Sequence, residues 1–192
     1  YKRASEGLAE LLEFAKRSKN FDSLLLSAIM NDLGMSYTYQ GLFGSAEPLL
    51  IEAIEIREKV LGGKHPLTAV SIGNLGMLYF NQGVYAKGEP LLSKALSINE
   101  ATLGKNHFAT ANILNLLGSV YLGKGEYSKA KSMYIRSLAI NEKALGKQHT
   151  KTAESMLALG MLYVRIGNYG DAAKLYSKAL NIFEKALGQQ HP

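Results

Sequence analysis

The sequence predicts an all-α fold, an α-α superhelix (a solenoid) of stacked helical hairpins. The first observation is a repeat of 42 residues, in which Leu-Gly recurs at Leu33-Gly34, Leu75-Gly76, Leu117-Gly118 and Leu159-Gly160. The second is that apolar and small residues within each repeat follow helical spacing. The third is a glycine that ends the first helix of every repeat, at Gly41, Gly83, Gly125 and Gly167. Such hairpins bury both faces only by stacking on their neighbours.

Each repeat is expected to contain two helices and a closing loop. In the first helix Ile72, Leu75, Gly76 and Tyr79 occupy i, i+3, i+4 and i+7 and therefore share one face. The second helix is expected from about Tyr85 to Leu103. Small residues recur where two helix backbones approach closely, at Ala46, Gly88, Ala130 and Ala172. The loop that follows reads Leu-Gly-x-x-His in every repeat: LGGKH, LGKNH, LGKQH and LGQQH.

The repeats predict one continuous solenoid over residues 1–192. Four full repeats are expected at about 22–65, 66–107, 108–149 and 150–192. Residues 1–21 match a second helix without the usual closing loop, and we expect them to form a partial or capping repeat. The last residues, His191-Pro192, fall at a repeat boundary, and we therefore expect the segment to be part of a longer array.

The recurring residues and their spacings resemble those of a known repeat family. Leu-Gly, x-x-Tyr, x-x-x-Gly, x-aromatic, x-x-Ala and a further Ala seven residues on resemble the tetratricopeptide repeat. The 42-residue length and the endings EIREKVLGGKHP and NIFEKALGQQHP are similar to its kinesin-light-chain type. The resemblance covers roughly residues 22–192. It implies a scaffold for protein–protein interaction. It also implies that the α-solenoid predicted from the periodicity is a right-handed superhelix.

Composition restricts the classes of function. The chain has no cysteine, which excludes disulfides, thiolate zinc sites and cysteine nucleophiles. It has no run of 18 apolar residues, so we expect no membrane span, and it has no N-x-[ST] sequon, which favours a cytoplasmic location. The net charge of +6 comes from lysines dispersed over second helices and loops, which favours solubility over a nucleic-acid-binding stripe.

Catalytic and metal-binding patterns have simpler explanations in the repeat. GSVYLGK at 118–124 has the spacing of a phosphate-binding loop, but the next residue is Gly125 instead of Ser or Thr. The histidines occur one per repeat, which predicts a turn-forming role and no metal site, at His65, His107, His149 and His191. Glu58, Glu100, Glu142 and Glu184 are expected on solvated helix surfaces. We therefore expect no enzyme and no cofactor.

The family resemblance places a binding groove on the first helices. In tetratricopeptide proteins one side of the first helix lines a concave groove that holds a peptide or a partner's helix. Carried over by position, the groove comprises Asn31, Met35, Asn74, Met77, Phe80, Asn81, Asn112, Asn115, Ser119, Glu154, Met161 and Arg165. The methionines would adapt to varied ligand shapes, and the asparagines could hydrogen-bond a peptide backbone.

Each groove assignment has an alternative. The methionines could instead fill space between adjacent first helices, and the asparagines could be solvated surface. A carboxylate clamp of the kind found in chaperone-binding members is not expected, because these positions hold no Lys or Arg before Arg165. The leading interpretation is a non-catalytic scaffold that binds a protein or peptide. The alternative is a structural segment of a larger signalling protein that associates end to end.

Overall fold

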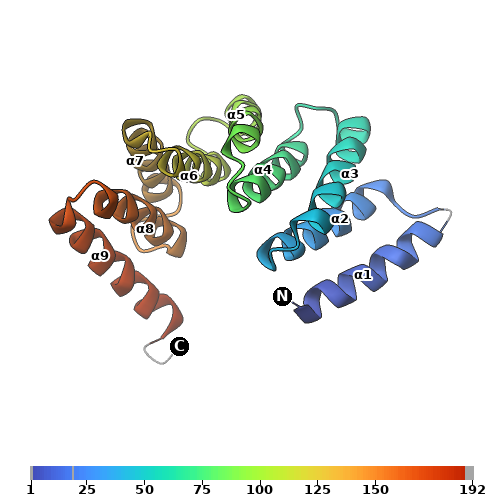
Figure 1. The fold of residues 1–192 in the computed structure, drawn as a ribbon, viewed down its shortest axis with the longest axis horizontal. Coiled ribbons are helices and arrows are strands. Elements are labelled where there is room, and N and C mark those ends of the chain that lie inside the picture. Colours follow the sequence, from blue (N-terminus) through green and yellow to red (C-terminus); the bar gives the residue numbers. More distant parts are fainter. Residues whose placement is uncertain (1, 19, 189–192) are drawn as a thin grey trace. The chain divides into compact units, whose positions relative to one another are not determined.

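A computed structural model describes residues 2–18 and 20–188, and these residues form nine α-helices and no strand (Figure 1). The sequence-based prediction of an all-α fold of helical hairpins is confirmed. The helices are α1 (Lys2–Arg17), α2 (Ser23–Tyr39), α3 (Phe43–Leu61), α4 (Pro66–Asn81), α5 (Tyr85–Thr102), α6 (Phe108–Gly123), α7 (Tyr127–Ala144), α8 (Thr150–Arg165) and α9 (Tyr169–Leu187).

The helices follow the predicted repeat. The first helices are α2, α4, α6 and α8, and the second helices are α3, α5, α7 and α9. The second helices begin at Phe43, Tyr85, Tyr127 and Tyr169, the aromatic residues that recur every 42 positions. The helix α1 takes the place of a second helix ahead of α2. The chain divides into two compact units, Tyr1–Ile98 and Asn99–Pro192.

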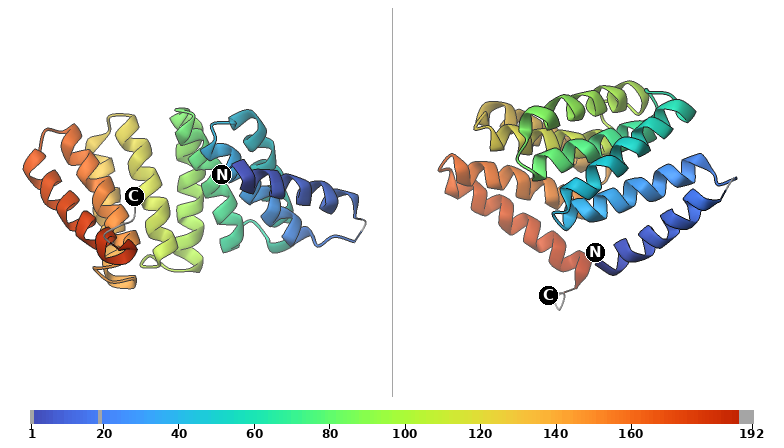
Figure 2. Two further views of the ribbon diagram at one scale, coloured as in Figure 1. Left: turned by 90° about the horizontal axis from the view of Figure 1, so that it is seen from below. Right: turned by 45° about the vertical axis from the view of Figure 1, so that its right-hand side comes forward.

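Within each unit, a first helix packs between two second helices. In the first unit α2 contacts both α1 and α3, and α3 also contacts α4 (Figure 2). In the second unit α8 contacts α7 and α9 in the same way (Figure 1). The turn between the two helices of a repeat contains Gly83 or its equivalent, and φ of Gly83 is +78°, a conformation that other residues rarely adopt.

The small residues of the motif lie where two helices of one repeat meet. Gly76 on α4 faces Leu92 and Gly88 on α5, so closely that a Cβ on Gly76 would lie 2.7 Å from Leu92 Cγ. Gly118 on α6 faces the ring of Tyr134 on α7. The segment GSVYLGK therefore lies almost entirely within α6, and its first glycine is a packing residue. The phosphate-loop interpretation is excluded on this geometry.

The repeated loop is held by a histidine and a threonine. His65, His107 and His149 each cap the helix that follows, because Nδ1 accepts the backbone N–H two residues on at 3.1–3.2 Å. Three residues beyond each histidine a buried threonine donates to the carbonyl of the loop glycine, as Thr110 Oγ1 does to Gly104 at 2.9 Å. The fourth histidine, His191, lies outside the described residues. The predicted turn role therefore takes the form of an N-cap.

We expect His149→Ala to lower the free energy of unfolding by about 1 kcal/mol, because the Lys151 N–H loses its cap acceptor. Urea unfolding followed by circular dichroism measures the change. His149→Asn is the matched control, since its side chain can still accept that hydrogen bond and should restore most of the loss. Equal losses in the two variants would show that the cap contributes nothing.

Ion pairs join successive second helices at one repeated pair of positions. Lys94 contacts Glu58 at 3.0 Å in the first unit, and Arg136 contacts Glu100 at 2.6 Å in the second. The same two positions between α1 and α3 hold Lys16 and Glu52, 3.6 Å apart, with the charges exchanged. Glu58 and Glu100, which were predicted on solvated helix surfaces, are thus half-buried, and each has a cationic partner. Exposed pairs of this kind contribute only about 0–1 kcal/mol each.

Candidate binding face of the first helices

The first helices leave one stripe uncovered by the second helices. It consists of positions i, i+3, i+7, i+10 and i+14, which fall on one side of a helix. We call these residues the open stripe. In the first unit they are Leu25, Ala28, Asp32, Met35 and Tyr39 on α2, and Leu67, Val70, Asn74, Met77 and Asn81 on α4. In the second unit they are Ala109, Asn112, Leu116, Ser119 and Gly123 on α6, and Lys151, Glu154, Ala158, Met161 and Arg165 on α8.

The open stripe of the first unit is strongly apolar near the start of α2 and α4. The exposed fractions of Leu25, Leu67 and Val70 are 52%, 47% and 43%. Since α2 and α4 contact each other, these side chains belong to neighbouring helices of one unit. Large exposed apolar side chains that gather in one place are a common mark of a binding surface.

The predicted methionines differ in their surroundings. Met35 is half-buried and packs against the cluster that contains Leu75 and Leu78, so it fills space between first helices. Met77 is also half-buried. Met161 is 55% exposed on α8. The space-filling alternative thus describes Met35, whereas Met161 is open to solvent.

The predicted asparagines also differ in their surroundings, because some bond to a neighbouring repeat and others are exposed. Asn31 is 5% exposed, and its Oδ1 accepts hydrogen bonds from Ser71 Oγ at 3.1 Å and Asn74 Nδ2 at 2.9 Å. This network continues to Arg57, which is buried and donates to Ser71 at 2.9 Å. Burial lowers the pKa of the Arg57 guanidinium, while the carboxylate of Asp32 acts in the opposite direction. Asn31 therefore connects two repeats inside the first unit.

Asn115 has the equivalent role in the second unit. Its Nδ2 donates to Ser155 Oγ at 3.0 Å, and Ser155 also accepts from Asn141 at 2.9 Å. Asn115 Oδ1 is a buried atom that lacks a partner in the described part of the chain. A ligand reaches this oxygen only if the side chain moves. Asn31 and Asn115 are 84 residues apart and bond to serines that are also 84 residues apart.

The remaining predicted residues lie at the surface or near it. Asn81, Asn112, Glu154 and Arg165 are exposed, and Phe80 is half-buried beside the ring of Tyr85, with 6.0 Å between the ring centroids. Glu154 pairs with Lys151 at 2.8 Å. Ser119 is half-buried and bonds to the Tyr134 hydroxyl at 3.0 Å. The exposed polar members therefore occur mainly in the second unit.

Sequence reasoning missed the apolar start of the open stripe. Leu25, Leu67 and Val70 lie on the same side of their helices as the methionines. Steps of three and four residues lead from each of them to a methionine, so helical periodicity alone could have identified them. Lys151, at the same position as Leu25 and Leu67, was also missed. The prediction instead followed the asparagines, three of which the structure places in hydrogen bonds between repeats, namely Asn31, Asn74 and Asn115.

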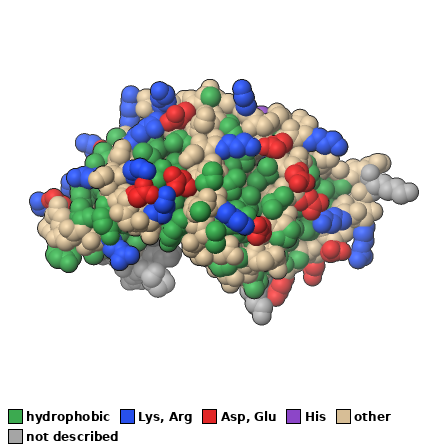
Figure 3. All heavy atoms as spheres, turned by 45° about the horizontal axis from the view of Figure 1, so that its top comes forward, with side chains coloured by type: hydrophobic (Ala, Val, Ile, Leu, Met, Phe, Trp, Pro, Cys, Tyr) green, Lys and Arg blue, Asp and Glu red, His purple; other side chains and the backbone are tan. Residues whose placement is uncertain are grey.

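The electrostatics of the surface are mixed. Lys and Arg side chains are interspersed with Asp and Glu side chains on the face shown in Figure 3. Lys124 and Lys129 both pair with Glu126, at 2.7 and 2.6 Å, and these hydrogen bonds lower the pKa of Glu126.

Among residues 2–18 and 20–188, no group of three or more His, Cys, Asp or Glu side chains is arranged to hold a metal ion. None of the described helices has the length and apolar character needed to cross a membrane.

Solved structures with the same fold include light-chain-like proteins. BtubC (BKLC) from P. vanneervenii has a TM-score of 0.77 at 23% identity, over 100% of this chain and 76% of that one. A putative kinesin light chain of Podosopora anserina with nearly identical TPR-like repeats has a TM-score of 0.74 at 22% identity, over 97% and 88% of the two chains. A Rap protein complexed with competence and sporulation factor has a TM-score of 0.78 at 13% identity, over 98% and 52%.

A family model gives the assignment. No curated protein matches the sequence at a significant level. The model described as tetratricopeptide repeat matches residues 25–83, 71–143 and 110–185, which together extend over most of the chain. These segments contain all four Leu-Gly pairs and the helices that carry the open stripe. The repeat spacing, the helical hairpins and this match together show that the chain belongs to the tetratricopeptide repeat family.

Proposed function

We propose that this chain is a non-catalytic scaffold that binds a peptide segment or a helix of a partner protein. The principal contact surface is the open stripe of the first unit, where Leu25, Leu67 and Val70 supply exposed apolar area. Apolar side chains at helical or extended spacing in the ligand would lie against them. The exposed apolar start of α2 and α4 carries this proposal.

The proposed ligand-contacting set differs from the sequence-based one. The exposed residues Asn81, Asn112, Glu154, Met161 and Arg165 stay in it, as does the half-buried Met77 of the open stripe. Leu25, Leu67, Val70 and Lys151 join it. Asn31 and Asn115 leave it, because their amides bond to serines of the next repeat. The ligand is thus expected to be largely apolar where it meets the first unit. Family membership and the Rap complex with competence and sporulation factor support the general role.

A peptide-display selection against the whole chain tests the proposal with two matched variants. Val70→Glu places a charge in the open stripe, and enriched peptides should bind it at least about tenfold more weakly, which corresponds to about 1.4 kcal/mol. Val60→Glu makes the same change at an equally exposed site on α3 and should leave binding unchanged. Peptides indifferent to Val70→Glu would contradict the proposed surface.

End-to-end association is the second candidate function, and the outer face of α1 favours it. Leu11 and Phe14 are 43% and 66% exposed, whereas Ala53, the equivalent of Leu11 in α3, is fully buried in the cluster that contains Met30 and Leu33 of α2. This face is therefore suited to another helix. Sedimentation over a wide range of protein concentration separates the two candidates, because only self-association makes the mass rise with concentration.

A further inference from the structure

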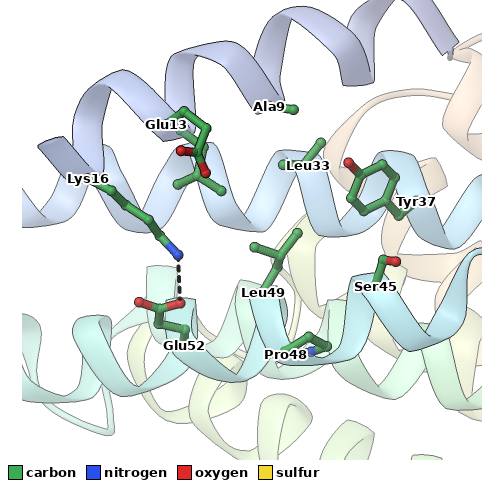
Figure 4. A pocket seen from close by; sticks show the side chains of 10 residues that line it. Ala9, Glu13, Lys16, Leu33, Tyr37, Ser45, Pro48, Leu49 and Glu52 are labelled. Carbon is green, nitrogen blue, oxygen red and sulfur yellow. Dashed lines mark ion pairs between the residues drawn. The ribbon is translucent and has the colours of Figure 1, made fainter.

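A cavity of about 380 Å³ opens between α1, α2 and α3 in the first unit (Figure 4). Ala9, Leu33 and Leu49 form apolar walls, and Tyr37 lies at one end. Lys16 and Glu52 close the opposite end with their ion pair. None of these residues belongs to the open stripe, so the cavity is a separate feature of the same unit.

Two small side chains leave this cavity open. The equivalent positions in the next repeat of the same unit hold Ile51 where the cavity has Ala9, and Lys87 where it has Ser45. There the amino group of Lys87 lies over the ring of Tyr79, 5.0 Å from its centroid. One repeat later, the corresponding positions therefore carry a larger aliphatic side chain and a lysine.

A lysine over the repeat tyrosine is the rule in this chain. Lys129 lies 5.2 Å from the centroid of the Tyr121 ring, and Lys131 lies 5.6 Å from that of Tyr163. Among the side chains that the structure describes, Tyr37 is the one repeat tyrosine without a lysine amino group in this position. Its ring thus offers a face that elsewhere attracts a cation.

The end of the cavity opposite Tyr37 is also more acidic than its equivalents in the other repeats, which favours the approach of a cation. The position of Glu52 is basic in the other three repeats, where it holds Lys94, Arg136 and Lys178. Glu13 adds a second carboxylate to the lining. Their cationic neighbours are Lys16, 3.6 Å from Glu52, and Arg17, 3.6 Å from Glu13. These exposed pairs are weak and can exchange partners.

We infer that this cavity binds a lysine side chain of a partner protein. The aliphatic stem of that lysine lies along Ala9, Leu33 and Leu49, and its ammonium group lies over the Tyr37 ring. A lysine suits the site because its stem is apolar and its end is charged. The partner thereby supplies the group that Lys87 and Lys129 supply within the chain. The chain then has a cation-selective contact in addition to its apolar open stripe.

The test is a titration of the whole chain with Nα-acetyl-lysine N-methylamide, followed by NMR of the Ala9 and Leu49 methyl groups. The norleucine analogue has nearly the same stem without the charge. We expect saturable shifts with the lysine compound and about three- to fivefold weaker binding of the norleucine compound. Equal binding of the two compounds, or the absence of saturable shifts, would overturn the inference.

Variants separate the site from general charge effects. Ser45→Lys restores the internal lysine and should abolish the shifts, whereas Ser128→Lys adds the same charge at an exposed position of α7 and should preserve them. Tyr37→Leu should also abolish binding, and Tyr37→Phe, which keeps the ring, should retain it. Lysine binding that survives Ser45→Lys, or that Tyr37→Phe abolishes, would overturn the assignment to the Tyr37 ring.

Discussion

Gly118→Val should lower the free energy of unfolding by about 2–3 kcal/mol, because there is no space for a side chain on this part of α6. A Cβ at Gly118 would lie 2.6 Å from Tyr134 Cε1 and 2.7 Å from Cδ1. Tyr134 is only 1% exposed, and its hydroxyl bonds to Ser119 at 3.0 Å. The ring can move only by disturbing buried neighbours, so α6 and α7 must separate.

Urea unfolding of the purified variant measures this loss, and Gly170→Val is its control. Gly170 lies in the first turn of α9, where a Cβ would meet no atom within 4 Å. The control makes the same exchange of glycine for valine within a helix but without the contact, and it should alter stability by less than about 1 kcal/mol. Equal losses in the two variants would assign the effect to valine itself and remove the steric explanation.

The 42-residue repeat was enough to predict the fold, because each repeated residue type has one local role. A glycine that faces a large side chain, as Gly118 faces Tyr134, has to recur wherever two helices approach closely. The histidines were predicted to form turns, and three of them are N-caps. The threonines that bond to the loop glycines were not predicted, although Thr68, Thr110 and Thr152 recur at the 42-residue spacing.

The residues of the candidate binding surface were harder to predict, because burial on a first helix depends on the following repeat. Asn31 shares its repeat position with Gly73 and Leu157, and this mixed column does not show which side chain faces solvent. Asn31 is buried at the contact with the next first helix, where Ser71 donates a hydrogen bond to it. The cavity beside Tyr37 could not be predicted from the sequence either, because it depends on the small size of Ser45 where the next repeat has Lys87.

Arg57→Ala should lower the free energy of unfolding by about 3 kcal/mol, through loss of buried volume and of several hydrogen bonds. Arg57 is 6% exposed and joins three helices of the first unit. It donates to Ser27 on α2 at 3.1 Å, and on α4 to the Leu67 carbonyl at 2.8 Å and Ser71 at 2.9 Å. Chemical unfolding of the variant and the parent chain gives the difference.

Two further variants show whether the polar groups or the volume of Arg57 matter more. Arg57→Asn copies the residue at the equivalent position of the second unit, where Asn141 donates to Ser155 at 2.9 Å and to the Lys151 carbonyl at 3.3 Å. Arg57→Met keeps most of the volume and removes every donor. We expect Arg57→Asn to recover about 1 kcal/mol of the alanine loss through one remaining donor group.

The methionine variant decides what the buried charge contributes. Replacing buried ionic groups by well-packed apolar ones is often neutral or stabilising, so parent-like stability of Arg57→Met would show that volume dominates. The Ser71–Asn31 hydrogen bond would then be enough to align α2 and α4. If Arg57→Met is instead as unstable as Arg57→Ala, the guanidinium itself holds the two first helices together. Since the open stripe spans α2 and α4, peptide binding should then weaken along with stability.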